Sequence, residues 1–393
     1  MAQPTANAPT RAASRDTWAV AAWLLVCCGM IFAMVVIGGI TRLTWSGLSI
    51  TEWQPVTGIV PPLSQADWQA EFAKYQQTSQ YRLLNSGMSL ADFKYIFLWE
   101  YVHRLWGRLI GFLYAVPLVY FLVRRQIPRR LTWPLVGIFL LGGAQGFLGW
   151  YMVKSGLVDR IEVSQYRLVA HLVLALAIYA ATLWTALGLI AKPSPASRER
   201  RDQPRQRLVG EGQLGAVSGI RPLTPTLSPN GGEGVIIAPG WQRAAEALIV
   251  LIALTITAGG FVAGLNAGLT YNTFPLMDGS FVPAGYAQLQ PFVRNWFENI
   301  PAVQFDHRLL AETTFIAVVL LWLAARHATL PRPARIALNA LLAMAGLQFA
   351  LGVSTLLLVV PIPLAAAHQA GAVLLLTAAI VFRRFAQFPY LGR

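Results

Sequence analysis

The sequence has few cysteines and few charged side chains. Cys27 and Cys28 are its only cysteines, and because they are adjacent they cannot supply the disulfide framework of a small secreted domain. Charged residues make up 12% of the chain and hydrophobic residues 55%. A soluble globular protein has about twice that share of charge. The composition therefore excludes a soluble enzyme and predicts an all-α protein with several membrane-spanning helices.

Eight stretches are long and apolar enough to cross a bilayer as helices. A polar segment precedes the first stretch, which is too long for the apolar core of a cleaved signal, so a retained helix is expected. The long loops at 40–95 and 266–300 contain several aromatic residues and predict structured caps over one end of the helices. The predicted spans lie near 17–39, 96–123, 131–152, 164–190, 243–265, 302–325, 334–358 and 363–382.

Acidic side chains are scarce relative to basic ones, with 17 Asp and Glu against 31 Lys and Arg and a net charge of +14. Arginine pairs flank the ends of predicted spans on the side to which both termini belong, at 124–125, 129–130 and 383–384. This positive-inside pattern predicts cytoplasmic termini in an inner (cytoplasmic) membrane. Because the arginines lie at the ends of the predicted spans and form no basic face, we expect the protein to contact a lipid bilayer and no nucleic acid.

An internal repeat divides the chain into two four-helix halves. An even number of spans separates the halves, so the repeat is a parallel tandem one and predicts two pseudo-symmetric four-helix bundles. Three markers recur in the same order: Gly38-Gly39 as Gly259-Gly260, His103-Arg104-Leu105 as His307-Arg308-Leu309, and Ala170-His171 as Ala367-His368.

The repeat also sets the expected domain boundaries. A segment rich in Pro, Gly, Ser and Arg separates the halves, and it has too little apolar surface to offset the entropy of ordering, so we expect a disordered cytoplasmic linker. The expected parts are a cytoplasmic tail at 1–16, the N-terminal half at 17–190, the linker at 191–242, the C-terminal half at 243–383 and a second tail at 384–393.

Each half carries two histidines inside its apolar segments. His103 and His171 form the N-terminal pair, and His307 and His368 form the C-terminal pair. Ionisable residues at membrane depth are rare and usually functional, and imidazole is a common axial ligand of heme iron. Four histidines at equivalent depth predict two heme iron sites toward the periplasmic side. The alternative is that they are hydrogen-bonded packing residues.

Charged side chains next to these histidines distinguish the halves. Arg104 and Arg308 follow the first histidine of each pair, where they could bind heme propionates or lipid phosphates. Glu100 lies three residues before His103 and hence on the same helix face, whereas the C-terminal half has Gln304 there. Because a carboxylate beside a heme can act as general base or stabilise a developing cation, we assign chemistry to the N-terminal half and electron supply to the C-terminal half. The alternative is a plain Glu100–Arg104 ion pair.

Several motifs resemble the heme A synthase family, in particular its cysteine-free, mitochondrial or alphaproteobacterial branch. They are Gly38–Thr44, Ser46–Ser49, Glu100–Arg104 and Asp306–Arg308, within the duplicated eight-span layout. The resemblance implies that a methyl group of heme O is oxidised to a formyl group by successive hydroxylations, which gives heme A for cytochrome oxidase.

The same resemblance implies roles for the two histidine pairs. Substrate heme O would lie between His103 and His171, with Glu100 as the acidic catalytic residue. A heme b cofactor would lie between His307 and His368, so that all four histidines are axial ligands of iron. The expected catalytic residues are therefore Glu100, His103 and His171, and from their position beside the histidines Arg104 and Arg308 join the expected cofactor-binding residues.

The resemblance further implies a heme O synthase as partner and an electron donor that the sequence does not identify; a homo-oligomer stays open. Two other functions fit four membrane histidines: a di-heme b-type electron-transfer cytochrome, and a heme-binding carrier or assembly chaperone. The difference between Glu100 and Gln304 favours an enzyme, because a pure electron carrier has less need of an acid in one pocket only.

Overall fold

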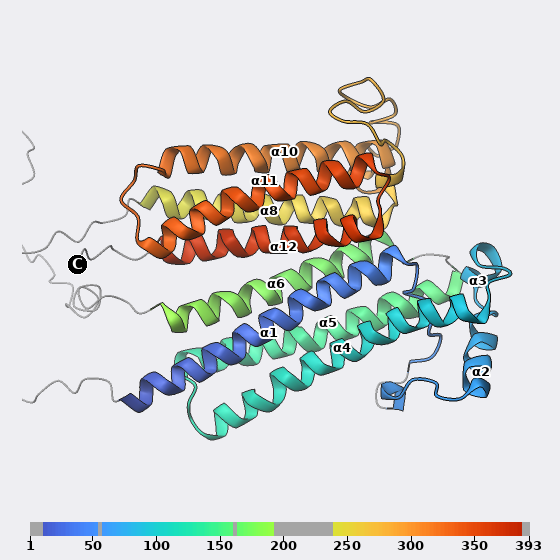
Figure 1. The fold of residues 1–393 in the computed structure, drawn as a ribbon, viewed down its shortest axis with the longest axis horizontal. Coiled ribbons are helices and arrows are strands. Elements are labelled where there is room, and N and C mark those ends of the chain that lie inside the picture. Colours follow the sequence, from blue (N-terminus) through green and yellow to red (C-terminus); the bar gives the residue numbers. More distant parts are fainter. Residues whose placement is uncertain (1–10, 54–56, 160–162, 192–238, 387–393) are drawn as a thin grey trace, which may run out of the picture.

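A computed structural model describes residues 11–53, 57–159, 163–191 and 239–386. Within these residues the chain is helical and has no strand. Eight helices are long and apolar enough to cross a membrane. The prediction of an all-α, multi-pass membrane protein is confirmed. The long helices lie side by side in one elongated bundle (Figure 1).

Most of the spanning helices extend slightly beyond the apolar stretches that predicted them. For α4, the Ser89 side chain accepts a hydrogen bond from the Asp92 amide while Asp92 accepts one from the Ser89 amide, a capping box that starts the helix in polar sequence. Prolines in the first turn begin the last three spans. The eight are α1 (Arg11–Leu43), α4 (Leu90–Val123), α5 (Arg129–Asp159), α6 (Gln165–Ile190), α8 (Pro239–Gly264), α10 (Ile300–Ala325), α11 (Arg332–Leu357) and α12 (Ile362–Phe385).

The predicted linker and tails fall largely outside the described residues. Residues 192–238 of the predicted linker are not described. Helix α8 begins at Pro239, inside the range 191–242 that was predicted for the linker. Helix α1 likewise begins at Arg11, inside the predicted N-terminal tail. The division of the chain into the five expected parts therefore stays a prediction.

Each spanning helix packs mainly on helices of its own half. Helices α4 and α6 both pack on α1 and on α5, and α10 and α12 both pack on α8 and on α11. Helices α1 and α6 also pack against α8 and α12, along a boundary that we call the seam. The two-bundle arrangement with repeat symmetry stays a prediction, because one apolar core runs through all eight spans, with members such as Leu24, Tyr114, Leu135, Leu183, Ile252, Val318, Leu338 and Leu376.

Both long loops fold over the same end of the bundle (Figure 1). The first cap has an aromatic cluster of its own, in which Tyr75, Phe93 and Phe97 are buried and Phe72 packs against them. The second cap has Asn295 and Asn299 buried and hydrogen-bonded to its backbone carbonyls. The short helices are η1 (Thr57–Ile59), α2 (Gln65–Tyr75) and α3 (Ser79–Leu84) in the first cap, and η2 (Ala267–Leu269), η3 (Phe292–Arg294) and α9 (Asn295–Glu298) in the second.

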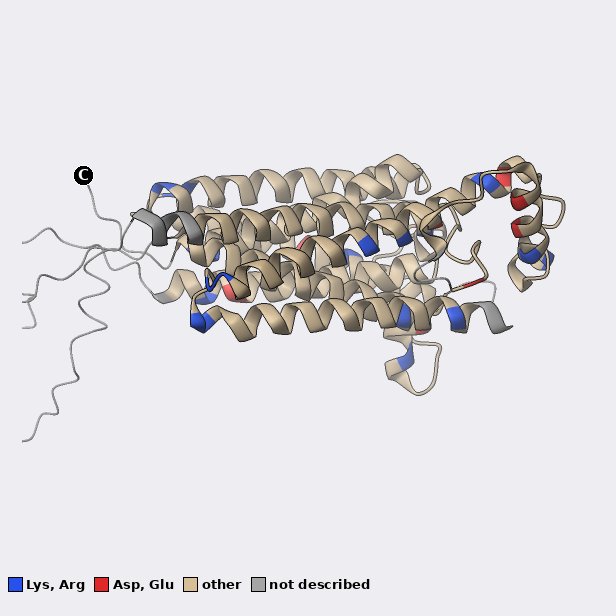
Figure 2. Cartoon of the chain, turned by 90° about the horizontal axis from the view of Figure 1, so that it is seen from below, with Lys and Arg blue, Asp and Glu red and all other residues tan. Residues whose placement is uncertain are grey.

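Charged side chains gather mostly toward the two ends of the bundle, and the stretch between is largely uncharged (Figure 2). Large apolar side chains face outward there, for example Phe112 at 66% exposed and Leu140 at 65%. An apolar exterior between two charged ends fits a lipid environment. The first span begins, and the last span ends, at the end of the bundle opposite the caps (Figure 1).

Candidate functional site

The four histidines lie on four different spanning helices, toward the capped end. The N-terminal pair comes from α4 and α6, and the C-terminal pair from α10 and α12. Since α4 and α6 both pack on α1 and α5, the members of the N-terminal pair approach each other diagonally across their helices; α10 and α12 have the same relation in the other half. The structure thus brings together the residues that the repeat paired.

Each imidazole rests against a glycine of a neighbouring helix. In the N-terminal pair, a Cβ built on Gly38 of α1 would lie 3.4 Å from Nε2 of His103, and one on Gly149 of α5 would lie 3.1 Å from Cε1 of His171. The distance at Gly149 is tighter than most real Cβ contacts, so that position favours glycine, whereas the distance at Gly38 is close to ordinary van der Waals contact.

The C-terminal pair repeats this contact more tightly. A Cβ built on Gly259 of α8 would lie 2.9 Å from Cε1 of His307, and one on Gly352 of α11 would lie 2.9 Å from Cε1 of His368. A side chain at either position would have to displace an imidazole. Glycine therefore lets the ring lie directly on the backbone of the next helix.

A hydrogen bond orients the ring of His307, and glutamine amides bind the backbone at His171 and His368. Nδ1 of His307 lies 3.1 Å from the Thr255 carbonyl oxygen, which can only accept, so Nδ1 carries the proton and Nε2 keeps a free lone pair for a metal. The Gln145 amide donates to the backbone carbonyl of His171, at 3.0 Å. The Gln348 amide donates to the carbonyl of His368, at 2.9 Å.

Three buried atoms at these histidines lack a partner among the described residues. They are Nδ1 of His171 and the Oε1 atoms of Gln145 and Gln348. As placed, Gln348 Nε2 also donates to Nδ1 of His368, at 3.1 Å, which leaves the proton on Nε2. Ligation of iron through Nε2 of His368 would require the amide to turn so that its oxygen accepts from Nδ1–H.

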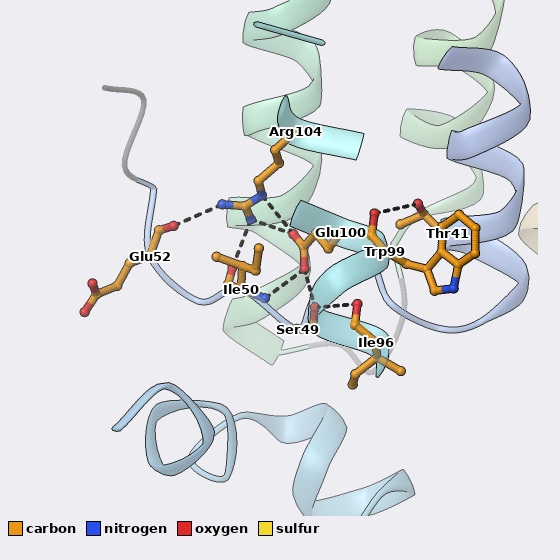
Figure 3. Close-up of polar contacts among 8 residues, drawn as sticks. All are labelled: Thr41, Ser49, Ile50, Glu52, Ile96, Trp99, Glu100 and Arg104. Carbon is orange, nitrogen blue, oxygen red and sulfur yellow. Dashed lines mark hydrogen bonds and ion pairs between the residues drawn. The ribbon is translucent and has the colours of Figure 1, made fainter. Parts of the chain in front are cut away.

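Glu100 lies in the N-terminal half with all its acceptor positions in use (Figure 3). It is 2% exposed. Its Oε1 accepts from Nε and Nη2 of Arg104 at 3.1 and 2.6 Å, and its Oε2 accepts from the Ser49 hydroxyl and the Ile50 amide, both at 2.8 Å. A carboxylate has about four acceptor sites, so Glu100 cannot take a proton from elsewhere without losing one of these bonds.

Arg104 completes the link between helix and cap. Its Nη2 donates to the Ile50 carbonyl at 2.9 Å and its Nη1 to the Glu52 carbonyl at 3.0 Å, and its guanidinium lies 5.5 Å from the Trp53 ring centroid. The sequence predicted the ion pair with Glu100 as an alternative but missed these carbonyl contacts. Contact of Arg104 with a propionate or a lipid phosphate stays a prediction.

The C-terminal half repeats this arrangement without the acid. Arg308 donates from Nη2 to the Tyr271 carbonyl at 2.6 Å and from Nη1 to the Thr273 carbonyl at 2.8 Å. Gln304 donates to the Tyr271 carbonyl at 3.2 Å. Nε of Arg308 and Oε1 of Gln304 are buried and have no hydrogen-bond partner among the described residues.

Within the described residues there is no group of three or more His, Cys, Asp or Glu side chains placed to hold a metal ion together. A heme iron needs only two protein ligands, because its porphyrin supplies the others. The pairs of imidazoles therefore fit a heme better than they fit a protein-only metal site.

The family model that matches this chain and relatives highly similar to it point to the same family. Residues 21–218 and 234–380 match the COX15-CtaA family model, described as cytochrome oxidase assembly protein. The chain is 53% identical to the heme A synthase of Nitrosospira multiformis, over 92% of this chain and 91% of that one. It is 48% identical to that of Rhodospirillum centenum, over 94% and 88%, and 42% identical to heme A synthase COX15 of Bos taurus, over 96% and 83%.

Proposed function

The chain belongs to the COX15-CtaA family of cytochrome oxidase assembly proteins, and we propose that it is a heme A synthase, an oxidoreductase that converts heme O to heme A. The observation that carries the proposal is the set of four histidines on facing helices, each with its ring against a glycine of the next helix. An electron-transfer cytochrome or a heme carrier would release heme O without chemical change, which distinguishes both alternatives from an enzyme.

The residues of both pairs fit a heme. Imidazole is a standard axial ligand, and the Thr255 carbonyl holds His307 in the tautomer whose Nε2 can bind iron. In the proposal, His307 and His368 hold heme b, and His103 and His171 hold heme O. A bound heme would supply the iron redox chemistry that the side chains of this chain lack.

Glu100 has two parts in the proposal. It fixes Arg104 and the cap backbone at residues 49–52, which holds the cap over the outer end of α4. It also places a negative charge on the helix face of His103, where it can stabilise a positive charge that develops during oxidation. Since all its acceptor positions are occupied, proton transfer to Glu100 requires that Ser49, Ile50 or Arg104 first release it.

The proposal includes a place in the membrane and partners. The capped end of the bundle faces the periplasm and the other end the cytoplasm, in the inner membrane, as the positive-inside pattern indicates. Heme O comes from a heme O synthase, and an electron donor supplies the reducing equivalents. Glu100 stands beside the N-terminal pair only, so methyl oxidation belongs there and electron supply to the C-terminal pair.

Co-expression with a source of heme O, followed by extraction and chromatography of the hemes, tests the proposal. The chain should produce hydroxylated and formyl hemes, and His103→Ala should abolish both. His327→Ala is the matched control, because His327 is exposed in the loop after α10. Heme O that stays unchanged in the presence of the intact chain would reject the proposal in favour of a cytochrome or a carrier.

A further inference from the structure

Two consecutive glycines near the end of α1 touch both halves of the protein. A Cβ built on Gly38 would lie 3.4 Å from Nε2 of His103, on α4. A Cβ built on Gly39 would lie 1.8 Å from Oε1 of Gln369, on α12 of the other half. Because no Cβ fits at that distance, glycine at position 39 is what lets the Gln369 side chain reach the α1 backbone.

The Gln369 side chain joins α12 to α1 by a hydrogen bond. Its Nε2 donates to the backbone carbonyl of Val35, at 2.9 Å. Gln369 directly follows His368, and Val35 lies about one helical turn before Gly38. A short path of bonded and hydrogen-bonded atoms therefore runs from His368 through Gln369 and the α1 backbone to the glycine on which His103 packs.

The corresponding contact of the repeat, between α8 and α6, is apolar. On α8, a Cβ built on Gly260 would lie 3.2 Å from Cδ2 of Leu172, on α6. Leu172 directly follows His171. Beside it, Gly259 packs against His307. The arrangement on α1 thus recurs on α8, but a leucine side chain cannot form a hydrogen bond, so only the Gln369 path is polar.

Cohesion of the seam does not depend on Gln369 alone. Tyr179 of α6 and Thr377 of α12 share a hydrogen bond of 2.7 Å between their hydroxyls. Arg42 at the end of α1 donates to the Ala263 carbonyl at 2.9 Å and to Oδ1 of Asn266 at 2.7 Å. Of these contacts, the Gln369 hydrogen bond is the one made by a residue adjacent to a histidine of the pairs.

We propose that Gln369 is a positioning residue that couples the two histidine pairs, and that electrons pass between the pairs along its hydrogen bond to α1. The inference rests on the proposed function, because it requires iron at each pair. With heme held at both pairs, His307 and His368 would hold the electron donor and His103 and His171 the acceptor of one electron. The Gln369 amide neither gains nor loses a proton. Packed side chains and hydrogen bonds carry energetic coupling between distant sites.

The test compares Gln369→Leu with Tyr179→Phe in the purified full-length chain loaded with heme. Gln369→Leu removes the hydrogen bond at similar volume and copies Leu172. Tyr179→Phe removes a hydrogen bond from the same seam at a position that is not next to a histidine. Heme content and absorption spectrum are recorded first. The rate of electron transfer between the hemes after rapid partial reduction is measured next.

The expected result is two hemes with unchanged spectra in both variants, and a loss of inter-heme transfer rate in Gln369→Leu only. An unchanged rate in Gln369→Leu would overturn the inference and leave the proposed function intact. So would equal slowing in Tyr179→Phe, or loss of heme from Gln369→Leu alone, since each would make the residue a structural support. Fewer than two hemes in the unaltered chain would overturn the proposed function and the inference together.

A second variant displaces the Gln369 side chain without changing it. Gly39→Ala adds a methyl group where Oε1 of Gln369 lies, whereas Gly29→Ala on the same helix has nothing within 4 Å of its added carbon. Gly39→Ala should slow inter-heme transfer as Gln369→Leu does, and Gly29→Ala should not. A normal rate in Gly39→Ala would contradict the path.

Discussion

At the scale of single residues, the two halves differ most where Glu100 of one half corresponds to Gln304 of the other. Both side chains are 2% exposed, and both neighbouring arginines donate to two cap carbonyls. Only Glu100 accepts a hydrogen bond from Nε of its neighbouring arginine, Arg104. Nε of Arg308 has no hydrogen-bond partner among the described residues. The same cap geometry is therefore built once with an ion pair and once without.

Replacing Glu100 by glutamine should destabilise the protein by about 3 kcal/mol, because it leaves the largely buried Arg104 without its counter-charge. The midpoint of thermal unfolding in detergent measures this. Glu71→Gln is the matched control, since its partner Lys74 is 38% exposed and such a surface pair contributes less than about 1 kcal/mol. Equal midpoints for the two variants would show that the Glu100 ion pair does not hold the cap.

The converse change, Gln304→Glu, should stabilise the second cap by about 1 kcal/mol, the typical net value of a hydrogen bond. The new carboxylate would meet Nε of Arg308, which is buried and has no hydrogen-bond partner among the described residues. The unfolding midpoint again gives the answer. A lower midpoint would mean that the cost of burying the carboxylate exceeds the gain from the arginine.

At the scale of helices, the common feature of all four histidines is a glycine on the adjoining helix. For His171, His307 and His368 the ring position depends on the absence of a side chain, because a Cβ on the adjoining glycine would lie 2.9 to 3.1 Å from the ring. In membranes small residues allow such close approach. Here glycine allows the close approach of an imidazole ring as well as the close packing of two helices.

Gly259→Ala should weaken heme binding at the C-terminal pair about tenfold, because the added methyl group would lie 2.9 Å from the His307 ring and turn it away from the iron. Gly346→Ala on α11 is the control, with nothing within 4 Å of its added carbon. Heme titration of the purified variants, followed by absorption, compares them. Full affinity in Gly259→Ala would mean that the glycine is not needed to place the ring.

The spans could be predicted from sequence because roughly 20 apolar residues in a row have few other ways to satisfy their backbone. The histidine pairs were predictable because ionisable residues are costly at that depth. The short cap helices α2 and α3 were not, since their ends depend on local hydrogen bonds to Ser64 and Thr78. The contact of Gln369 with Val35 joins residues far apart in the chain, and only the repeated glycine pairs hinted that two helices meet there.

At the scale of the whole molecule, eight spans place both ends of the described chain on the side away from the caps (Figure 1). Cys27 and Cys28 are 1% and 5% exposed, so the unaltered chain should react little with a thiol reagent that cannot cross membranes. This low background allows the orientation to be tested with single cysteines.

Gln69→Cys in the first cap should be labelled by such a reagent in intact cells, whereas His327→Cys should be labelled only after the membrane is opened. Both positions are exposed, so accessibility depends on the side of the membrane alone. The reverse pattern would place the caps in the cytoplasm and contradict the positive-inside assignment.

The seam makes the protein more than two independent halves. One apolar core passes through all eight spans, and Gln369 ties the helix of His368 to the helix on which His103 packs. In the proposed account, a change at one histidine pair would act on the other through these contacts. Substrate and cofactor hemes would be held at a spacing that the seam defines.

Heme content per chain tests the central claim most directly. The purified, heme-loaded chain should bind two hemes with low-spin, bis-imidazole absorption, and His103→Ala and His307→Ala should each remove one heme while the other keeps its spectrum. A single heme in the unaltered chain, or loss of both from either variant, would contradict the assignment of one heme to each histidine pair.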